Sequence, residues 1–314
     1  MKMIHQFLLP AVAALLTSGI ASADNVFVSN NGSNSVEEIG ASNMPTQIID
    51  TGLNSPTGIA IYGNDLFVAN NGSSLDAGYI EEYNLTTDAA VGMYATGLVG
   101  PRGIAFDSAG NLYVADQGNG TVVEIPTGGG SLDTLASGLT APNDVVYSNG
   151  VLYATEGGAN LVVTISEGSA TTLVNGSGLS SPNGIAVGSG NLLVVSHGSN
   201  QVLAYTVGGA PLGSAVEPAF QSSLSGPKAI AVDSKGDFYV TDNGDETVTE
   251  YSPTGQLLEV YSTDINNNPA FNGSGFIVTQ AVVPEPTTWA LLLAGVSFLF
   301  YLGRRKTAVL AVVR

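Results

Sequence analysis

The chain has 314 residues, with 26 acidic and 8 basic side chains and no cysteine. The lack of cysteine excludes disulfides, thiol nucleophiles and thiolate metal sites. Residues 24–283 contain only three basic residues against 25 acidic ones, which gives this part a formal net charge of −22. Binding to nucleic acid needs clustered Lys and Arg, so this charge excludes nucleic acid as a partner.

Residues 1–23 have the pattern of a secretory signal peptide. Lys2 supplies a positive charge, residues 7–16 form an apolar core, and the small residues "ASA" at 21–23 provide a cleavage site. We therefore expect the mature chain to begin at Asp24 and to be exported.

A strand-like pattern occurs six times in the middle of the chain. An aromatic residue or Leu, a β-branched stretch, a polar residue and Gly recur at intervals of 40, 46, 40, 40 and 46 residues. The copies begin at Phe27, Phe67, Tyr113, Tyr153, Leu193 and Tyr239. A second pattern precedes each later copy, as "SPTGIAI" from Ser55, "GPRGIAF" from Gly100, "APNDVVY" from Ala141, "SPNGIAV" from Ser181 and "GPKAIAV" from Gly226. Two patterns in fixed phase indicate a structural repeat.

Each repeat contains about four strand-sized runs, which is typical of a β-propeller blade. In the third repeat the predicted strands are "GIAFD", "NLYVAD", "TVVEI" and "LDTLAS". The first-strand pattern is missing once, and "NGSGFIV" at 272–278 supplies it. We therefore predict an all-β, six-bladed propeller over residues 24–281, closed by a C-terminal strand that joins the N-terminal blade.

These repeats, of the form "PxGIAVD" followed by "NLYVAD" and "GN", resemble those of the NHL-repeat propellers. They resemble more loosely the gluconolactonase-like and streptogramin-lyase-like propellers. The resemblance covers nearly the whole mature chain and implies the fold. It implies no single activity, because such propellers include enzymes, protein binders and polysaccharide-associated proteins.

Polar side chains are predicted to gather on one face of the disc. In an antiparallel blade the end of the second strand and the start of the first strand lie on the same face. The second strands end at Asn30, Asn70, Asp116, Glu156, Ser196 and Asp242. We interpret Asn143, Asn183, His197, Asp116 and Glu156 as candidate binding residues on this rim. The alternative is that such side chains hydrogen-bond the backbone of adjoining turns.

The sequence predicts no catalytic residue and no required cofactor. A bound Ca²⁺ is the alternative, because carboxylate oxygens are its ligands, and Asp242 and Asp245 in "DNGDE" are the candidate ligands. His197 is the only imidazole after the signal peptide, which excludes a multi-histidine metal site. His197 stands where other blades carry Asn or Gln, which favours a structural role in a turn.

The looser resemblance implies an alternative function as a divalent-cation-dependent lactonase, hydrolase or lyase at the rim. Asn143 and Asn183 would match ligands of the gluconolactonase type. Lys228 stands in the next blade where that family places an acidic ligand. A cation beside a lysine is disfavoured, so this remains the second hypothesis.

The C-terminal segment is apolar and ends in a basic cluster. Residues 282–286 form a linker, 287–303 an apolar helix and 304–314 a basic tail that we expect in the cytoplasm. Seventeen helical residues span about 25 Å, against about 30 Å for a hydrocarbon core. The segment is therefore a marginal transmembrane helix.

The combination of Pro284, Glu285 and Pro286, an apolar helix, and Arg304 with Arg305 resembles the PEP-CTERM sorting signal of Gram-negative bacteria. The extra "TAVLAVVR" at the end departs from that pattern. The resemblance implies recognition of the Pro-Glu-Pro motif by an exosortase, a membrane protease-transpeptidase, and a role in exopolysaccharide or biofilm. The helix would then hold the chain in the inner membrane only transiently.

These observations predict an exported, monomeric, non-enzymatic binding or matrix protein of the cell envelope. It would lie in the periplasm, on the outer surface or in the extracellular matrix. The expected partners are an exosortase-like enzyme and an exopolysaccharide or another envelope protein. Because the propeller is strongly acidic, we expect contact with an anionic polysaccharide to need Ca²⁺ bridges, or the sugars to be neutral.

Overall fold

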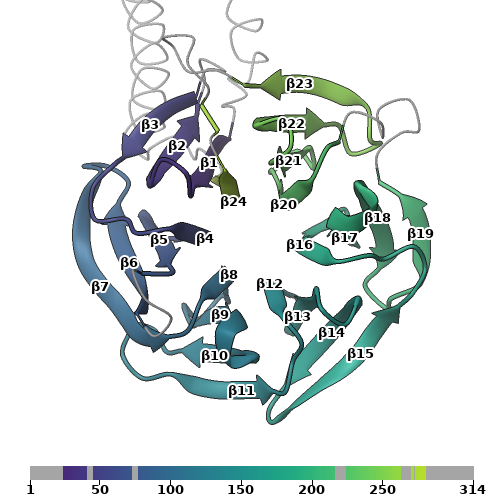
Figure 1. Ribbon diagram of the computed structural model, residues 1–314, viewed down its shortest axis with the longest axis horizontal. Helices are drawn as coiled ribbons and strands as arrows, with labels where there is room; N and C mark the ends of the chain where they lie inside the picture. The colour runs from purple at the N-terminus through teal and green to yellow at the C-terminus, as the bar shows by residue number, and fades with distance from the viewer. Residues whose placement is uncertain are drawn as a thin grey trace, which may run out of the picture. The chain divides into compact units, whose positions relative to one another are not determined.

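The computed structural model describes residues 24–40, 45–72, 77–215, 224–262, 270–271 and 273–280. Residues 24–280 form one compact unit. Its strands form six four-stranded sheets arranged around a central axis, as Figure 1 shows. The prediction of a six-bladed, all-β propeller is therefore confirmed.

The strands of each blade run from the innermost, beside the axis, to the outermost. From inside to outside, blade one contains β24 (Ser274–Gln280), β1 (Asn25–Asn30), β2 (Ser35–Ile39) and β3 (Pro45–Ile49). Blade two contains β4 (Pro56–Tyr62), β5 (Asp65–Asn70), β6 (Gly78–Asn84) and β7 (Ala89–Leu98). Blade three contains β8 (Pro101–Phe106), β9 (Leu112–Asp116), β10 (Thr121–Ile125) and β11 (Asp133–Ser137).

Blade four contains β12 (Pro142–Ser148), β13 (Val151–Glu156), β14 (Leu161–Ser166) and β15 (Ser169–Asn175). Blade five contains β16 (Pro182–Gly188), β17 (Asn191–Ser196), β18 (Gln201–Thr206) and β19 (Pro211–Ser214). Blade six contains β20 (Pro227–Val232), β21 (Phe238–Asp242), β22 (Thr247–Tyr251) and β23 (Leu257–Tyr261). Two 3-10 turns follow second strands, η1 (Gln117–Asn119) and η2 (His197–Ser199).

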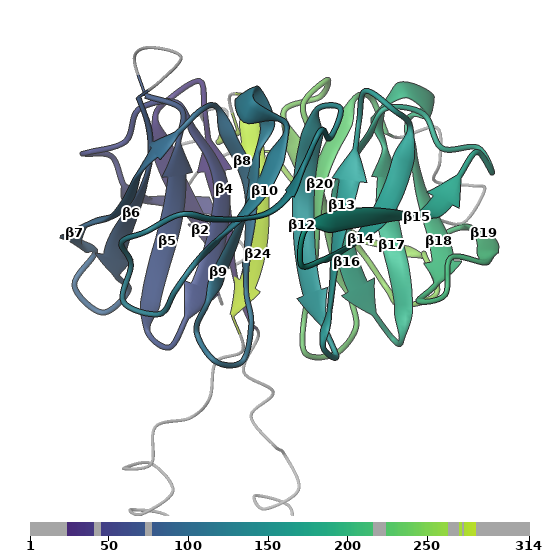
Figure 2. The same ribbon diagram turned by 90° about the horizontal axis from the view of Figure 1, so that it is seen from below.

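The ring closes by joining the two ends of the propeller in one blade. Strand β24 pairs antiparallel with β1, with Val28 opposite Ile277 and Asn25 opposite Gln280. Figure 2 shows β24 among the inner strands of the disc. The predicted closure by a C-terminal strand is therefore confirmed.

The strands form where the sequence predicts them because their apolar residues pack on both faces. The second strands are almost wholly buried between neighbouring sheets, and all five residues of β9 are buried. Outer strands have one exposed side, as in β11. The largest apolar cluster surrounds the closure, where Phe27, Ile59, Tyr239 and Phe271 pack together. Burial of this kind is the main favourable term for folding.

An irregularity recurs where each inner strand begins. In blades two to six the register between the first and second strands shifts just after the opening proline, for example between Pro101 and Ile104 and between Pro142 and Asp144. A bulge re-aims the side chain of the extra residue. The residues that follow these prolines therefore lie outside the regular pairing of the first and second strands, and they lie at one end of the axis.

The predicted sorting segment, with its helix at 287–303, lies outside the described residues, as does the signal peptide. Within the described residues no helix combines the length and apolar character needed to cross a membrane.

Candidate functional site

The polar side chains that end the second strands form a buried ring, at most 6% exposed. In five blades they accept a hydrogen bond from the backbone two residues before the opening proline of the same blade. The bonds run from Asn54 N to Asn70 Oδ1 (2.8 Å), Val99 N to Asp116 Oδ1 (2.7 Å), Thr140 N to Glu156 Oε2 (2.8 Å), Ser180 N to Ser196 Oγ (2.8 Å) and Ser225 N to Asp242 Oδ2 (2.5 Å). This ring, which we call the rim ring, therefore fixes the loops that lead to the inner strands.

Three predicted site residues, Asp116, Glu156 and Asp242, belong to the rim ring. Burial raises the pKa of the Asp116 and Asp242 carboxyls. The second oxygen of Asp242 accepts a hydrogen bond from Gly244 N at 3.2 Å, and the neighbouring Asp245 is exposed. In the part of the chain that the structure describes, no three His, Asp or Glu side chains lie close enough together to hold a metal ion. The Ca²⁺ site at Asp242 and Asp245 stays a prediction.

A second ring consists of the residues that follow the opening prolines, and we call it the mouth. Its members are Thr57, Arg102, Asn143, Asn183 and Lys228. A chain of side-chain hydrogen bonds runs along one side of the mouth. Arg102 Nε donates to Gln117 Oε1 at 3.3 Å, Gln117 Nε2 to Asn143 Oδ1 at 2.6 Å, and Asn143 Nδ2 to Pro182 O at 2.8 Å. These contacts hold Arg102 and Asn143 in place across three blades.

Two of the three basic residues of 24–283 lie at the mouth, on opposite sides of the axis. Arg102 is on β8 and Lys228 on β20, and Figure 1 shows these strands facing each other. Burial lowers the pKa of the Arg102 guanidinium. Burial, together with the charge of Arg102, lowers the pKa of the Lys228 ammonium to about 8. The two positive charges therefore act on each other inside a poorly solvated mouth.

Asn183 is the mouth residue of blade five, on β16, and Lys228 is the mouth residue of the next blade, on β20. Its backbone oxygen accepts a hydrogen bond from Thr155 Oγ1 at 2.6 Å. Its side-chain oxygen is buried, and among the described residues it has no hydrogen-bond partner. A buried polar atom of this kind requires an explanation, and a bound ligand group is one.

His197 occupies a structural slot that other blades fill with an amide. Its Nδ1 lies 2.9 Å from Pro227 O, the carbonyl of the proline that opens the next blade. Asn31, the equivalent residue of blade one, donates from Nδ2 to Pro56 O at 3.4 Å. In blade four the slot holds Gly157, and the amide of Asn143 takes over the equivalent contact with Pro182. The imidazole therefore repeats a contact between blades.

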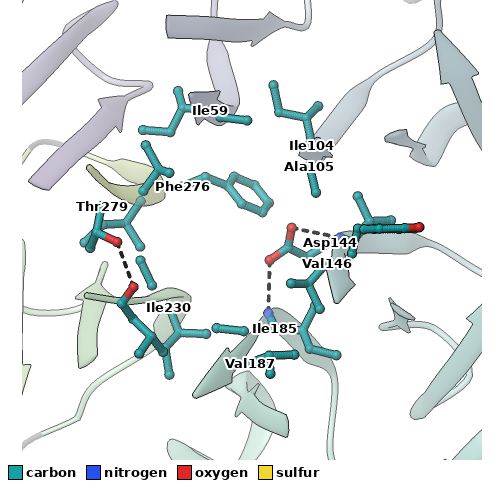
Figure 3. Close-up of a pocket in the computed structure, with 18 of the residues that line it drawn as sticks. Ile59, Ile104, Ala105, Asp144, Val146, Ile185, Val187, Ile230, Phe276 and Thr279 are labelled. Atoms are coloured by element: carbon teal, nitrogen blue, oxygen red, sulfur yellow. Dashed lines mark hydrogen bonds between the residues drawn. The ribbon is translucent and has the colours of Figure 1, made fainter. Parts of the chain in front are cut away.

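Further along the axis the inner strands of all six blades enclose a cavity of about 280 Å³. Figure 3 shows aliphatic side chains such as Ile59, Ile104 and Ile230 around it, with the ring of Phe276 and the carboxyl of Asp144 pointing inward. Asp144 is 6% exposed. Its Oδ1 accepts a hydrogen bond from Val145 N at 2.9 Å and its Oδ2 one from Ile185 N at 3.0 Å.

Burial raises the pKa of the Asp144 carboxyl to about 8, although the two backbone donors oppose the shift. A carboxyl group in an apolar site holds its proton because the charged form loses the solvation of water. At neutral pH the carboxyl of Asp144 is therefore mostly in its neutral form.

The sequence alone did not single out Asp144 or Arg102 as candidates. The signal for Asp144 lies in the repeat itself, since "APND" has Asp where "SPTG", "GPRG" and "SPNG" have Gly. The signal for Arg102 is the scarcity of basic residues, together with its repeat position, which is the same as that of Lys228. Neither could be ranked without knowing that the post-proline positions meet at one mouth.

Two sequence families match parts of this chain. Residues 98–125, which include β8, β9 and β10, match the NHL repeat. Residues 282–306, which include Pro284, Glu285, Pro286, Arg304 and Arg305, match the PEP-CTERM protein-sorting motif. The chain carries an NHL repeat and a PEP-CTERM motif. A PEP-CTERM motif implies export and processing by an exosortase-like system. No curated protein matches the chain.

Solved structures share the propeller fold with this PEP-CTERM chain at low sequence identity. A chain of a nidogen–laminin complex is 16% identical over 82% of this chain and 98% of its own length, with a TM-score of 0.69. The virginiamycin B lyase of Staphylococcus aureus is 18% identical over 76% of this chain and 80% of its own, with a TM-score of 0.54. A streptogramin B lyase is 15% identical over 82% of this chain and 92% of its own, with a TM-score of 0.58. Identities this low establish the fold alone.

Proposed function

We propose that this protein is a non-enzymatic binding protein of the cell envelope, delivered by exosortase-type sorting, whose propeller binds an anionic group of its ligand at the mouth. The sorting half of the proposal is supported by the PEP-CTERM match at 282–306. The binding half rests on one observation, which is that Arg102 and Lys228 lie on facing inner strands and that the charge of Arg102 acts on Lys228.

The electrostatics of the mouth favour a single anionic group as ligand. Arg102 and Lys228 repel each other in a poorly solvated place, and an anion between them would remove that repulsion. Their side chains also supply charge-assisted hydrogen bonds, which are stronger than neutral ones. Asn183, with its unsatisfied side-chain oxygen, could turn its amide to donate from Nδ2 to the same group.

The net charge of the propeller limits the size of that anionic ligand. A polyanion would be repelled by the acidic surface, as the sequence already predicts. Repulsion from exposed charges falls off over about 8 Å at physiological ionic strength, so the nearby groups decide the binding of one carboxylate or phosphate at the mouth. The basic pair attracts it, and burial raises the pKa of the adjoining Asp116 and Asp242 carboxyls, which reduces their repulsion. The proposed ligand is therefore a largely neutral saccharide or peptide that carries one acidic group.

The experiment compares D-glucuronate with D-glucose, because the two sugars differ in one carboxylate. Binding to the purified protein is measured by titration calorimetry or ligand-observed NMR. We expect glucuronate to bind at least about tenfold more tightly, as expected for one charge-assisted hydrogen bond. Lys228→Gln should remove that preference.

Lys235→Gln is the matched control for this test. Lys235 is the third basic residue of 24–283, and it is exposed in the turn after β20, at the other end of that strand from the mouth. It changes the net charge by the same amount, so it should leave glucuronate binding within about twofold. Equal loss in both variants, or equal binding of the two sugars by the wild type, would contradict the proposal.

The hydrolase or lyase alternative stays a prediction. Arg102 and Lys228 disfavour a divalent cation at the mouth, because like charges repel strongly in a poorly solvated site. Turnover of a lactone panel that depends on added Ca²⁺ or Mg²⁺, and that is lost in Asn183→Ala, would replace the binding proposal by the enzymatic one.

A further inference from the structure

Asp144 breaks the repeat at a level where neighbouring inner strands approach each other closely. The equivalent positions of the other inner strands are Gly58, Gly103, Gly184, Ala229 and Gly275. A Cβ on Gly103 would clash with the Asp144 carboxyl, and a Cβ on Gly58 would clash with the backbone of β8. The small residues thus let the strands approach closely, and Gly103 leaves the space that the Asp144 side chain fills.

The groups that surround the cavity form a typical recognition set for an ammonium ion. Asp144 offers a carboxylate whose oxygens are already oriented by Val145 N and Ile185 N. Phe276, on β24, directs its ring into the same space, as Figure 3 shows. A carboxylate and an aromatic face both attract a cation, and the attraction increases when water is excluded. Most of the other side chains in the lining are aliphatic, and an apolar body attached to the charge would pack against them.

We propose that the central cavity binds a small apolar primary ammonium ion, with Asp144 as its counter-ion and Phe276 as its cation–π partner. This site is separate from the mouth and goes beyond the function proposed above. The volume of about 280 Å³ suits one aromatic ring with a short ammonium-bearing arm, since a cavity of about 150 Å³ holds benzene. The acidic surface of the propeller raises the local concentration of cations.

The cavity continues along the inner strands to Tyr147 and Thr279, away from the mouth. A cation would enter from this end, because Arg102 and Lys228 repel it at the other. Tyr147 is the second titratable side chain in the lining. The strands packed against β12 also carry Arg102 on β8, Asp116 on β9 and Glu156 on β13.

The first test uses phenethylammonium, 2-phenylethanol and 3-phenylpropionate, which share a phenyl ring and differ in charge. Affinities for the purified protein are measured by titration calorimetry at pH 7. We expect phenethylammonium to bind at least about tenfold more tightly than the alcohol. The carboxylate is tested on Lys228→Gln, which removes the proposed anion site at the mouth, and there it should show no binding. Equal affinity for the amine and the alcohol would overturn the proposal.

The second test uses variants of the two proposed partners of the ammonium ion. Asp144→Asn and Asp144→Gly, the latter restoring the glycine of the repeat, should both abolish the preference for the amine. Asp133→Asn is the same substitution on an exposed outer strand and should leave the preference unchanged. Phe276→Leu should weaken amine binding several-fold more than alcohol binding. Retention of the amine preference in a folded Asp144→Gly variant would overturn the proposal.

The third test needs no variant and so does not depend on whether the substitutions fold. Asp144 is mostly protonated in the empty cavity at pH 7 and must lose its proton when it pairs with an ammonium ion. Binding should therefore release close to one proton, measured from the dependence of the binding enthalpy on the ionisation enthalpy of the buffer. Binding with no proton release would overturn the role of Asp144.

Discussion

The rim ring and the axis both contain buried polar groups, but only the rim ring follows the repeat. At the rim, Asn70, Asp116, Glu156, Ser196 and Asp242 differ in chemistry and yet accept the same backbone hydrogen bond. At the axis, Asp144 stands where the other blades have Gly or Ala, and Arg102 and Lys228 stand where other blades have Thr or Asn. A polar residue that conforms to the repeat serves the scaffold, whereas a charge that departs from it marks a candidate site.

The most damaging single change should be Gly103→Ala, because its methyl group would collide with the neighbouring inner strand β12. The new methyl group would clash with the Asp144 carboxyl, and we expect the free energy of unfolding to fall by about 3 kcal/mol. Chemical denaturation of the single variants and of Gly103→Ala with Asp144→Gly checks the cause. Because the new methyl group would also lie 2.7 Å from the Asp144 Cα, the second change should restore only part of the lost stability. No restoration at all would show that the Asp144 carboxyl does not contribute to the clash.

The pH dependence of stability should show the raised pKa of the Asp144 carboxyl. Its folded-state pKa is raised to about 8, whereas an unfolded Asp titrates near 3.9. Between pH 5 and 7 the unfolded chain has lost this proton and the folded chain retains it, so raising the pH favours unfolding. Stability should fall by about 1 kcal/mol per pH unit more in the wild type than in Asp144→Gly. If the free energy of unfolding changes equally with pH in the two proteins across this range, the carboxyl of Asp144 is not held neutral by burial.

Glu156→Ala should lower stability by about 2 kcal/mol and leave ligand binding unchanged. The substitution removes the buried Glu156 carboxyl, which accepts the hydrogen bond of Thr140 N–H. Glu167→Ala, in the exposed turn after β14, removes the same charge and should change stability by less than about 0.5 kcal/mol. If Glu156→Ala loses glucuronate binding while its stability is unchanged, Glu156 takes part in ligand binding and does not only stabilise the fold.

The smallest effect is expected at His197. In His197→Asn the amide should replace the ring nitrogen at Pro227 O, as Asn31 does at Pro56 O. Thermal unfolding should show a change of less than about 0.5 kcal/mol, and neither sugar nor amine binding should change. A large loss of either binding activity would show that His197 acts on a ligand.

Much of the fold was predictable because repeated patterns carry it. Six copies of the second strand indicated the number of blades, and the position of "NGSGFIV" indicated the closure that β24 and β1 confirm. The predicted strands of blade three correspond to β8, β9, β10 and β11, with shifts of one or two residues at some ends. Boundaries of this kind depend on backbone pairing, which a sequence pattern does not define closely.

The site was less predictable because it depends on contacts between blades. The sequence placed Asp116 and Glu156 on the correct rim, but could not show that their oxygens are engaged by Val99 N and Thr140 N. It treated Lys228 as an argument against a cation and did not connect it with Arg102. That connection requires the ring geometry, which brings residues 126 positions apart in the sequence to one mouth.

The central claim is that the propeller is the delivered protein and the C-terminal segment is its removable signal. Intact-mass analysis of the exported protein, produced in a host with an exosortase, tests this claim most directly. Removal of the signal predicts a mature C-terminus close to residue 286, next to the motif of Pro284, Glu285 and Pro286. An exported protein that retains Arg304 and Arg305 would contradict the claim and would make the segment a permanent anchor.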